Sequence, residues 1–234
     1  MRSCLILPAD AEQALAPALG CGAAALLLRL GPPVENEARR RARERARLII
    51  TEARCRPAAP RIFVQVAPAR SAVVEADLDA LAGALPGGVF LEACAGRADL
   101  QQLSVKLAVR EAAAGVAEGS TSIVALAAQT PAAIFQLGTY AGASPRLTAL
   151  AYDEASLLDA MSGAIAEGAA PLSAARALLV FAAAAAGVPA LDCAPKDGAK
   201  LETACTAARR EGFSGMLAQA PDQIGVIEAA FSAA

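Results

Sequence analysis

The sequence predicts an α/β protein in which residues 1–234 form a single (β/α)₈ TIM barrel domain. Eight short apolar runs alternate with longer segments rich in helix-forming residues, and 56% of the 234 residues are hydrophobic, enough for one large core. A continuous apolar run is typical of a parallel strand that is buried on both faces. The expected strands are residues 4–7, 24–30, 61–66, 88–91, 122–127, 147–152, 189–192 and 212–217.

The segments between these runs predict the helices, because parallel neighbours must be joined by a crossover of a dozen or more residues. Residues 35–54 and 199–210 are rich in Ala, Leu, Arg and Glu and predict two of them. Sharp breaks are expected at residues 31–33 and 57–60, where prolines cluster. The longest apolar stretch, residues 177–191, contains Gly187 and Pro189 and is shorter than the roughly 18 residues of a membrane span. It predicts a buried helix that runs into a strand.

A doubly wound open sheet shows the same alternation of strands and helices and is the alternative fold. Its nucleotide-binding members have a glycine-rich turn after the first strand, whereas the first run here ends in Leu-Pro-Ala-Asp at residues 7–10. The chain also has no Walker-type phosphate loop. The barrel is therefore favoured.

Composition argues against several classes of partner and site. A net charge of -2 indicates no nucleic-acid binding, and the basic residues are interleaved with acids. The six cysteines form no CxxC pair, and the chain has no histidine to complete a zinc site or a Cys-His dyad. Reduced thiols, and a start without the order of a signal peptide, predict a cytoplasmic protein that does not enter a membrane.

Several segments resemble the citrate lyase beta subunit and its relatives in the HpcH/HpaI aldolase and malyl-CoA lyase superfamily. The opening RSCLILPAD at residues 2–10 is similar to the family's first strand, and SPRLTAL at residues 144–150 to the entry of its sixth. Residues 185–192, 212–215, 221–224 and 227–231 keep the order and spacing of its closing region. The resemblance spans essentially the whole chain.

The resemblance implies a barrel of the phosphoenolpyruvate/pyruvate-binding type that forms trimers or hexamers. It also implies Mg²⁺ as the cofactor, if the protein is active. The implied ligand is a 2-oxo or 3-hydroxy acid, often an acyl-CoA thioester, in which a carbon-carbon bond is made or broken. By the same comparison, the chain is expected to lack the family's C-terminal lid segment.

The family's functional positions carry other residues in this sequence. Its Glu after the fifth strand and its Asp after the sixth correspond to Ala128 and Ser156, neither of which replaces a carboxylate as a Mg²⁺ ligand. An acidic motif after the second strand corresponds to Arg29 and Gly31. The remaining substitutions are Gln65 for an Arg, Glu92-Ala93 for a Pro-Lys pair, Pro131 for an Arg, Met216 for a Lys and Ala220 for a His.

Polar residues close to these positions are the candidates for a site. A shift of one or two residues brings Gln129 to the fifth-strand position and Asp153 and Glu154 to the sixth, where they are candidate metal ligands. Alternatively, the two acids form the start of the next helix, where the helix dipole favours negative charge. Asp192, at a strand end, either faces the pocket or caps the following helix.

Arg29 also has two interpretations. It binds an anion in the pocket mouth, or it has a structural role, in which it fills the volume of the missing acids or pairs with Glu92. The arginine-rich run at residues 39–47 is interpreted as a solvated helix face. The pocket candidates are Arg29, Gln65, Glu92, Gln129 and Asp192.

Three functional hypotheses follow. The first is a diverged barrel with lost or altered catalysis, kept as a binding or complex-forming subunit that takes a small carboxylate or acyl-CoA ligand and associates with itself or with an active paralogue. The second is a Mg²⁺-dependent carbon-carbon lyase with ligands relocated to Asp153, Glu154 or Asp192. The third is a metal-independent isomerase or hydrolase that uses Cys94 or Cys193, for which the sequence has no histidine base.

Overall fold

Eight parallel strands close into a barrel in the computed structural model, which describes residues 1–56, 59–84, 86–162, 165–166 and 168–232. Each strand pairs with its neighbour in the sequence, and β1 closes the ring by pairing with β8. The strands are β1 (Ser3–Pro8), β2 (Ala25–Arg29), β3 (Arg61–Val66), β4 (Gly88–Leu91), β5 (Ser122–Leu126), β6 (Leu147–Ala151), β7 (Ala190–Cys193) and β8 (Gly215–Ala218). The predicted barrel and its eight strands are confirmed.

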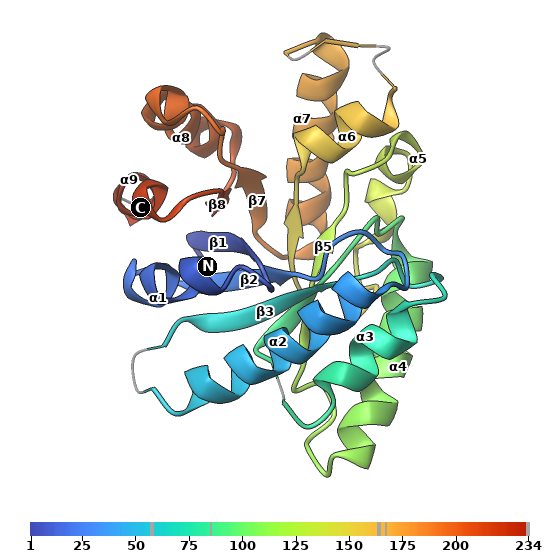
Figure 1. Cartoon of the computed structure of the whole chain (residues 1–234). Helices are drawn as coiled ribbons and strands as arrows, with labels where there is room; N and C mark the ends of the chain where they lie inside the picture. The colour runs from blue at the N-terminus through green and yellow to red at the C-terminus, as the bar shows by residue number, and fades with distance from the viewer. Residues whose placement is uncertain (57–58, 85, 163–164, 167, 233–234) are drawn as a thin grey trace.

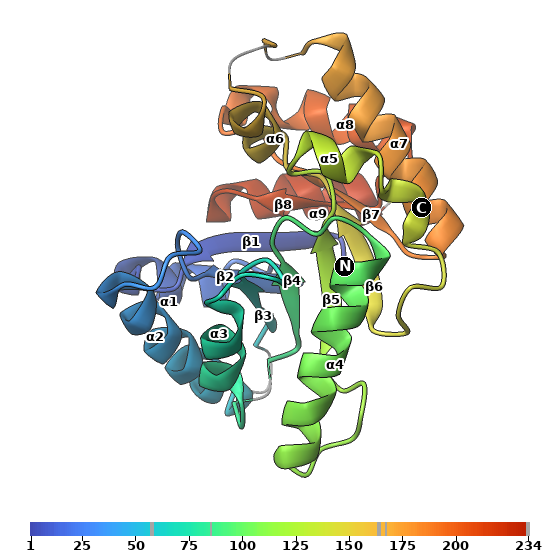
Figure 2. The ribbon, with the colours of Figure 1, turned by 90° about the vertical axis from the view of Figure 1, so that its right-hand side faces the viewer.

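Helices follow the strands and cover the outside of the barrel. Figure 1 shows α2, α3 and α4 on one side of the strands and α8 and α9 on the other, and Figure 2 shows α4, α5 and α7 from the side. Their bounds are α1 (Glu12–Gly20), α2 (Glu37–Arg54), α3 (Val74–Leu81), α4 (Arg97–Ala113), α5 (Pro131–Ile134), α6 (Glu154–Ala160), α7 (Ala170–Ala186), α8 (Leu201–Glu211) and α9 (Ile224–Ser232). Short 3₁₀ turns are η1 (Leu137–Thr139), η2 (Gly198–Lys200) and η3 (Pro221–Gln223).

The alternation of side chains along each strand creates two apolar cores. One lies inside the barrel and contains Phe63 and Phe90, whose rings meet edge to face with centroids 5.5 Å apart. Gly88 makes room for this pair, because a Cβ at this position would lie 2.6 Å from the Phe63 ring. The other core lies between the strands and the helices and takes the alternate residues, such as Leu5 and Leu91.

The interpretation of residues 39–47 as a solvated face is wrong for two of the arginines. Arg39 is 2% exposed and Arg43 is 5% exposed, and both pair with Asp77 of α3. They are four residues apart and therefore lie on the same face of α2, which packs against α3. Asn36 begins this helix, since its side-chain oxygen accepts a hydrogen bond from the Arg39 amide.

The apolar stretch at residues 177–191 forms the second half of α7 and enters β7, as predicted. The helix is not buried on all sides, because Leu178 is 47% exposed and Phe181 is 70% exposed on its outer face. Among the described residues, no helix is both long and apolar enough to cross a membrane.

Candidate functional site

The polar site lies at the carboxyl ends of the strands, where the functional groups of (β/α)₈ barrels gather. Side chains alternate between the two faces of a strand. On each strand, the residue two positions after the last inward-facing apolar side chain therefore faces the mouth. Leu27 and Leu191 face the interior, so Arg29 of β2 and Cys193 of β7 face the mouth. The same rule places Gln65, Glu92, Asp153 and Gln219 there.

Arg29 is the centre of this mouth. Its Nε donates a hydrogen bond of 3.1 Å to Gln65 Oε1, and its Nη2 lies 3.8 Å from Asp153 Oδ2. Its side chain is 40% exposed, so the guanidinium reaches solvent. The ion pair that the structure shows for Arg29 is therefore with Asp153, and the Arg29 charge also acts on Glu92.

Asp153 lies in the mouth and also begins α6. Its Oδ1 accepts a hydrogen bond of 3.2 Å from the Ser156 amide, which caps the helix, while its Oδ2 accepts one of 2.7 Å from the Ser156 hydroxyl. Gln129 Nε2 donates a further bond of 2.9 Å to Oδ2. The helix-start interpretation of Asp153 therefore holds, and the same side chain also lies in the mouth.

Gln129 links two strand ends. Its Oε1 accepts a hydrogen bond of 2.7 Å from the amide of Ala93, a residue with a φ of 46°, in the left-handed region. Its Nε2 bonds to Asp153 and, at 3.2 Å, to the Ser156 hydroxyl. The side chain is 6% exposed, so Gln129 holds Asp153 in place.

Glu92 follows β4 and lies beside Gln65. Burial raises the pKa of its carboxyl above the usual value, against the opposing effects of Arg39, of a hydrogen bond with Gln65 and of Arg29. Asp77 acts in the same direction as burial. Its Oε2 is buried and has no hydrogen-bond partner among the described residues.

Two predicted site acids lie elsewhere. Asp192 does not face the pocket, because its neighbours Leu191 and Cys193 take the inward positions. It bonds instead to Arg176 Nη1 of α7 at 2.6 and 2.7 Å and to the Cys193 amide, so it does not cap the following helix either. Glu154 lies beside the hydroxyl of Tyr152, whose pKa is raised by burial and then by the Glu154 charge.

A Mg²⁺ site needs oxygen ligands, usually one or two carboxylates together with water. Within the described ranges, no three His, Cys, Asp or Glu side chains converge. Asp153 already accepts bonds from Gln129 and Ser156, and the Arg29 cation lies beside it. Ala128, which the sequence comparison predicts at the position of the family's Glu, is fully buried. The residues as arranged do not fit a magnesium site.

The cysteines named for nucleophilic catalysis do not suit that role. Burial raises the pKa of Cys94 to about 11, and this side chain belongs to the core outside the barrel. Burial, followed by the Asp153 charge, raises the pKa of Cys193 to about 12. A nucleophilic cysteine needs a lowered pKa, so these thiols stay protonated near neutral pH.

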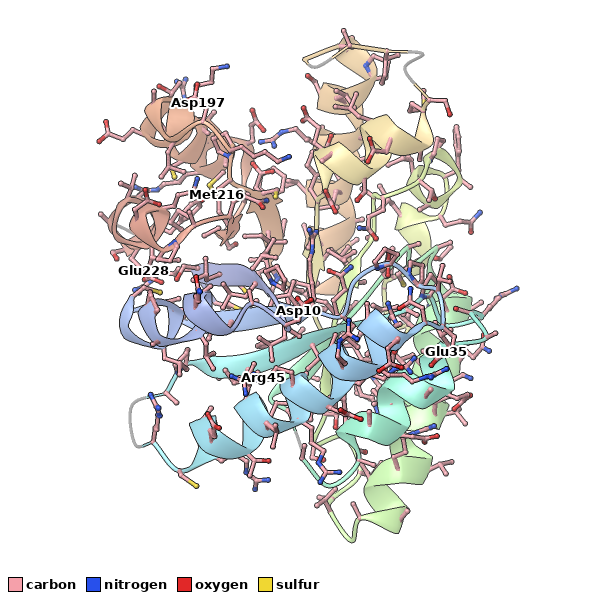
Figure 3. All side chains as sticks on the ribbon, viewed as in Figure 1. Asp10, Glu35, Arg45, Asp197, Met216 and Glu228 are labelled. Atoms are coloured by element: carbon pink, nitrogen blue, oxygen red, sulfur yellow. The ribbon has the colours of Figure 1, made fainter. Side chains whose placement is uncertain are left out.

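Near β8, neither Met216 nor Ala220, the two positions named from the family resemblance, is the residue that faces the mouth. Met216 is labelled in Figure 3. Its sulfur lies 3.5 Å from Cys205 Sγ of α8. Gln219 faces the mouth instead, where its side-chain Nε2 lies 3.0 Å from Cys193 Sγ. Its backbone N–H donates a hydrogen bond of 2.8 Å to Gln223 Oε1. Gln219 could have been found from the sequence, because it follows the inward-facing Leu217 by two residues.

Comparisons with known proteins agree with this architecture. Residues 2–221 match the HpcH/HpaI aldolase/citrate lyase family. No curated protein matches the chain. RipC from Yersinia pestis has a similar structure, with 23% identity and a TM-score of 0.78 over 99% of this chain and 94% of its own.

Two further solved structures share the fold. CitE from Mycobacterium tuberculosis, in complex with magnesium, acetoacetate and coenzyme A, has 21% identity and a TM-score of 0.79, covering 100% of this chain and 81% of its own. Haloferax volcanii malate synthase, a magnesium/glyoxylate complex, has 17% identity and a TM-score of 0.82, covering 98% and 74%. Since the family match covers most of the residues of the closed barrel, the chain belongs to the HpcH/HpaI aldolase/citrate lyase family.

Proposed function

We propose that this protein is a diverged member of the family that has lost the Mg²⁺-dependent carbon-carbon chemistry and binds a small carboxylate at the barrel mouth. The observation that carries the proposal is the position of Arg29. Its guanidinium provides a positive charge in the mouth, beside Asp153. Arg29 therefore supplies the charge that a metal supplies in an active relative.

The geometry of Arg29 suits a carboxylate. Guanidinium binds carboxylates in a bidentate fork. Among the described residues, its one hydrogen bond is the Nε bond to Gln65, and Nη2 has only the 3.8 Å ion pair with Asp153, so both terminal nitrogens keep hydrogen-bonding capacity. Relatives of the same fold have acetoacetate and glyoxylate bound, and these are the natural probes for this chain.

A Mg²⁺-dependent lyase that acts on an oxo acid or an acyl-CoA thioester is the second candidate. Family membership and the position of Asp153 in the mouth favour it. It requires Asp153 to exchange its bonds with Gln129 and Ser156 for a metal ion, and a second carboxylate to move toward it. The first proposal requires neither change.

The test is a thermal-shift titration with acetoacetate, in Mg²⁺ and separately in EDTA. Ligand at about a hundredfold excess over its Kd stabilises the fold by about 2.7 kcal/mol. We expect the same rise in Tm in both buffers, and its loss in Arg29→Gln. Arg41→Gln is the matched control, because Arg41 is 65% exposed on α2 and its removal deletes the same charge.

Either of two results overturns the proposal. One is a rise in Tm that requires Mg²⁺, and the other is cleavage of an oxo acid or thioester by the purified protein. Both restore the lyase. If acetoacetate raises the Tm of Arg29→Gln as much as that of Arg41→Gln, Arg29 does not bind the ligand.

We further propose that the chain self-associates. Phe135, after α5, is 86% exposed, and Leu178 and Phe181 present apolar surface on α7. The two helices are in contact with each other. Exposed aromatic side chains of this kind mark interaction surfaces. The cytoplasmic location remains a prediction.

A further inference from the structure

Gln219, just past the end of β8, has a side-chain oxygen that the proposed carboxylate site does not use. Its Nε2 donates a hydrogen bond to Cys193 Sγ at 3.0 Å, whereas its Oε1 accepts no hydrogen bond within the described ranges. Gln219 is half-buried, and its Oε1, unlike Glu92 Oε2, is an accessible atom. The mouth therefore contains an unpaired acceptor that a ligand can reach.

Two hydrogen bonds fix the position of this side chain. The backbone N–H of Gln219 donates to Gln223 Oε1 at 2.8 Å. Gln223 is 4% exposed and is held in turn by a bond of 2.8 Å from its Nε2 to the Pro195 carbonyl. At the other end, Nε2 of Gln219 faces the Cys193 sulfur, so Oε1 is turned away from it. An acceptor that is held in place before binding loses little entropy when a donor arrives.

Gln219 and Arg29 open onto the same mouth. Strands β6 and β7 pair in register, so Asp153 and Cys193, each two residues past a paired inward-facing residue, stand at the same level on neighbouring strand ends. Besides burial, which raises it most, the charges of Asp153 and Arg29 act on the pKa of the Cys193 thiol. Cys193 thus lies between the Gln219 amide, which it contacts, and the ion pair of Arg29 with Asp153.

A ligand that meets both groups needs an anion for one and a hydrogen-bond donor for the other. The Arg29 guanidinium only donates, and a carboxylate is its preferred acceptor. An amide oxygen only accepts, so Gln219 Oε1 takes the hydrogen of a hydroxyl group. A ketone oxygen has no hydrogen to donate and leaves Oε1 unpaired. A hydroxy acid therefore satisfies both groups, whereas the corresponding oxo acid satisfies one.

We propose that Gln219 is a specificity-determining residue, through which the site prefers a small hydroxy carboxylate to the oxo acid of the same carbon skeleton. This inference rests on the proposed function, because Arg29 holds the carboxylate. A site that hydrogen-bonds a ligand hydroxyl discriminates against the analogue that lacks it, since the protein group then loses its contact with water and gains no partner.

The test is calorimetric titration, in EDTA, with two matched pairs of ligands: lactate with pyruvate, and each enantiomer of 3-hydroxybutyrate with acetoacetate. In at least one pair we expect the hydroxy acid to bind about tenfold more tightly than the oxo acid, the equivalent of one hydrogen bond. The two pairs place the hydroxyl at different distances from the carboxylate. The pair with the larger preference therefore indicates how far Gln219 Oε1 lies from the bound carboxylate.

Gln219→Met removes the acceptor and keeps the length of the side chain. We expect this variant to bind the hydroxy acid about tenfold more weakly and the oxo acid as the wild type does, so that the preference disappears. Its unchanged affinity for the oxo acid shows that the variant is folded. Gln102→Met, the same change at an exposed position on α4, keeps the wild-type preference.

The outcomes separate this inference from the function on which it rests. Equal affinities within both pairs, or tighter binding of the oxo acids, overturn the specificity of Gln219 while the Arg29 site stands. A preference that survives in Gln219→Met does the same, and so does an equal loss of both kinds of ligand in that variant. If the wild type binds none of these acids, the proposed function and this inference are both wrong.

Discussion

At the scale of single residues, the mouth is a set of polar side chains that hold one another. Gln65 is 8% exposed, Gln129 6% and Asp153 5%, and each is hydrogen-bonded to another member of the site. Buried polar groups are stable only when they are paired in this way. Arg29 is the member of this group that extends its charge to solvent.

The buried carboxyl of Glu92 makes the stability of the fold depend on pH. Because burial raises its pKa in the folded state, the folded protein holds this proton more tightly than the unfolded chain does. Its cost to stability is absent below the ordinary glutamate pKa and grows as the pH rises toward the raised value. Glutamine does not titrate, so we expect Glu92→Gln to be stabilised relative to the wild type more at about pH 8 than at about pH 4. Urea unfolding without ligand measures this, and an equal difference at both pH values contradicts it.

At the scale of elements, a buried ion network ties α2 to α3 and to the loop after β2. Asp77 accepts hydrogen bonds from Arg39, from Arg43 and, at 2.9 Å, from the Ala67 amide. Arg39 Nη1 also donates to the carbonyls of Gly31 and Pro32, both at 2.7 Å. Glu35, two residues before α2 (Figure 3), forms an ion pair with Arg43, in which Glu35 Oε2 lies 2.7 Å from Arg43 Nη2.

Asp77→Asn is expected to destabilise the fold by about 3 kcal/mol or more, because it leaves two buried guanidinium groups without their shared counter-ion. Asp79→Asn is the matched control on the same helix. Its side chain is 68% exposed, and its pairing with Arg110 contributes about 1 kcal/mol at most. Denaturant midpoints of the two variants give the comparison, and similar midpoints would show that the network adds nothing to stability.

At the scale of the whole molecule, charge and apolar surface are segregated around the barrel. The exposed charges of α2 include Arg40, Arg41 and Glu37, whereas the outer face of α7 presents alanines with Leu178 and Phe181. Figure 2 shows α7 and α5 next to each other, away from α2. This uncharged side supports an interface between copies.

We expect light scattering to give a mass that is a multiple of 23.5 kDa, with a trimer or hexamer as the predicted state. Phe181→Ser should shift the mass toward that of one chain, because it removes an exposed aromatic group that an interface would bury. Val34→Ser, a change at a residue 58% exposed beside α2, should leave the mass unchanged. A monomeric wild type contradicts self-association, and a complex that forms only with an active paralogue identifies the alternative partner.

Much of the fold was predictable from local sequence. All eight strands start and end within three residues of the predicted positions, and the largest difference is at β8. There Gly212, with a φ of 101°, ends α8 instead of starting the strand. Apolar runs separated by helical segments identify a parallel barrel because both faces of each strand must be buried.

The pocket was less predictable, for the same physical reason. When both faces of a strand are apolar, the sequence shows no polar alternation that distinguishes the interior of the barrel from its outside. Asp153 follows the inward Ala151 by two residues and faces the mouth, whereas Asp192 follows the inward Leu191 by one and faces α7. A difference of one residue sends equivalent acids to opposite sides of the sheet.

By itself, the sequence determined the order of the elements and the family, because these depend on local composition and spacing. The tertiary structure alone decided which charges meet. Arg39 and Arg43 bind an acid from another helix, and Arg29 meets Asp153 across the barrel mouth. The first pairs depend on the packing of α2 against α3, and the last depends on the closed barrel, which brings the ends of β2 and β6 to the same mouth.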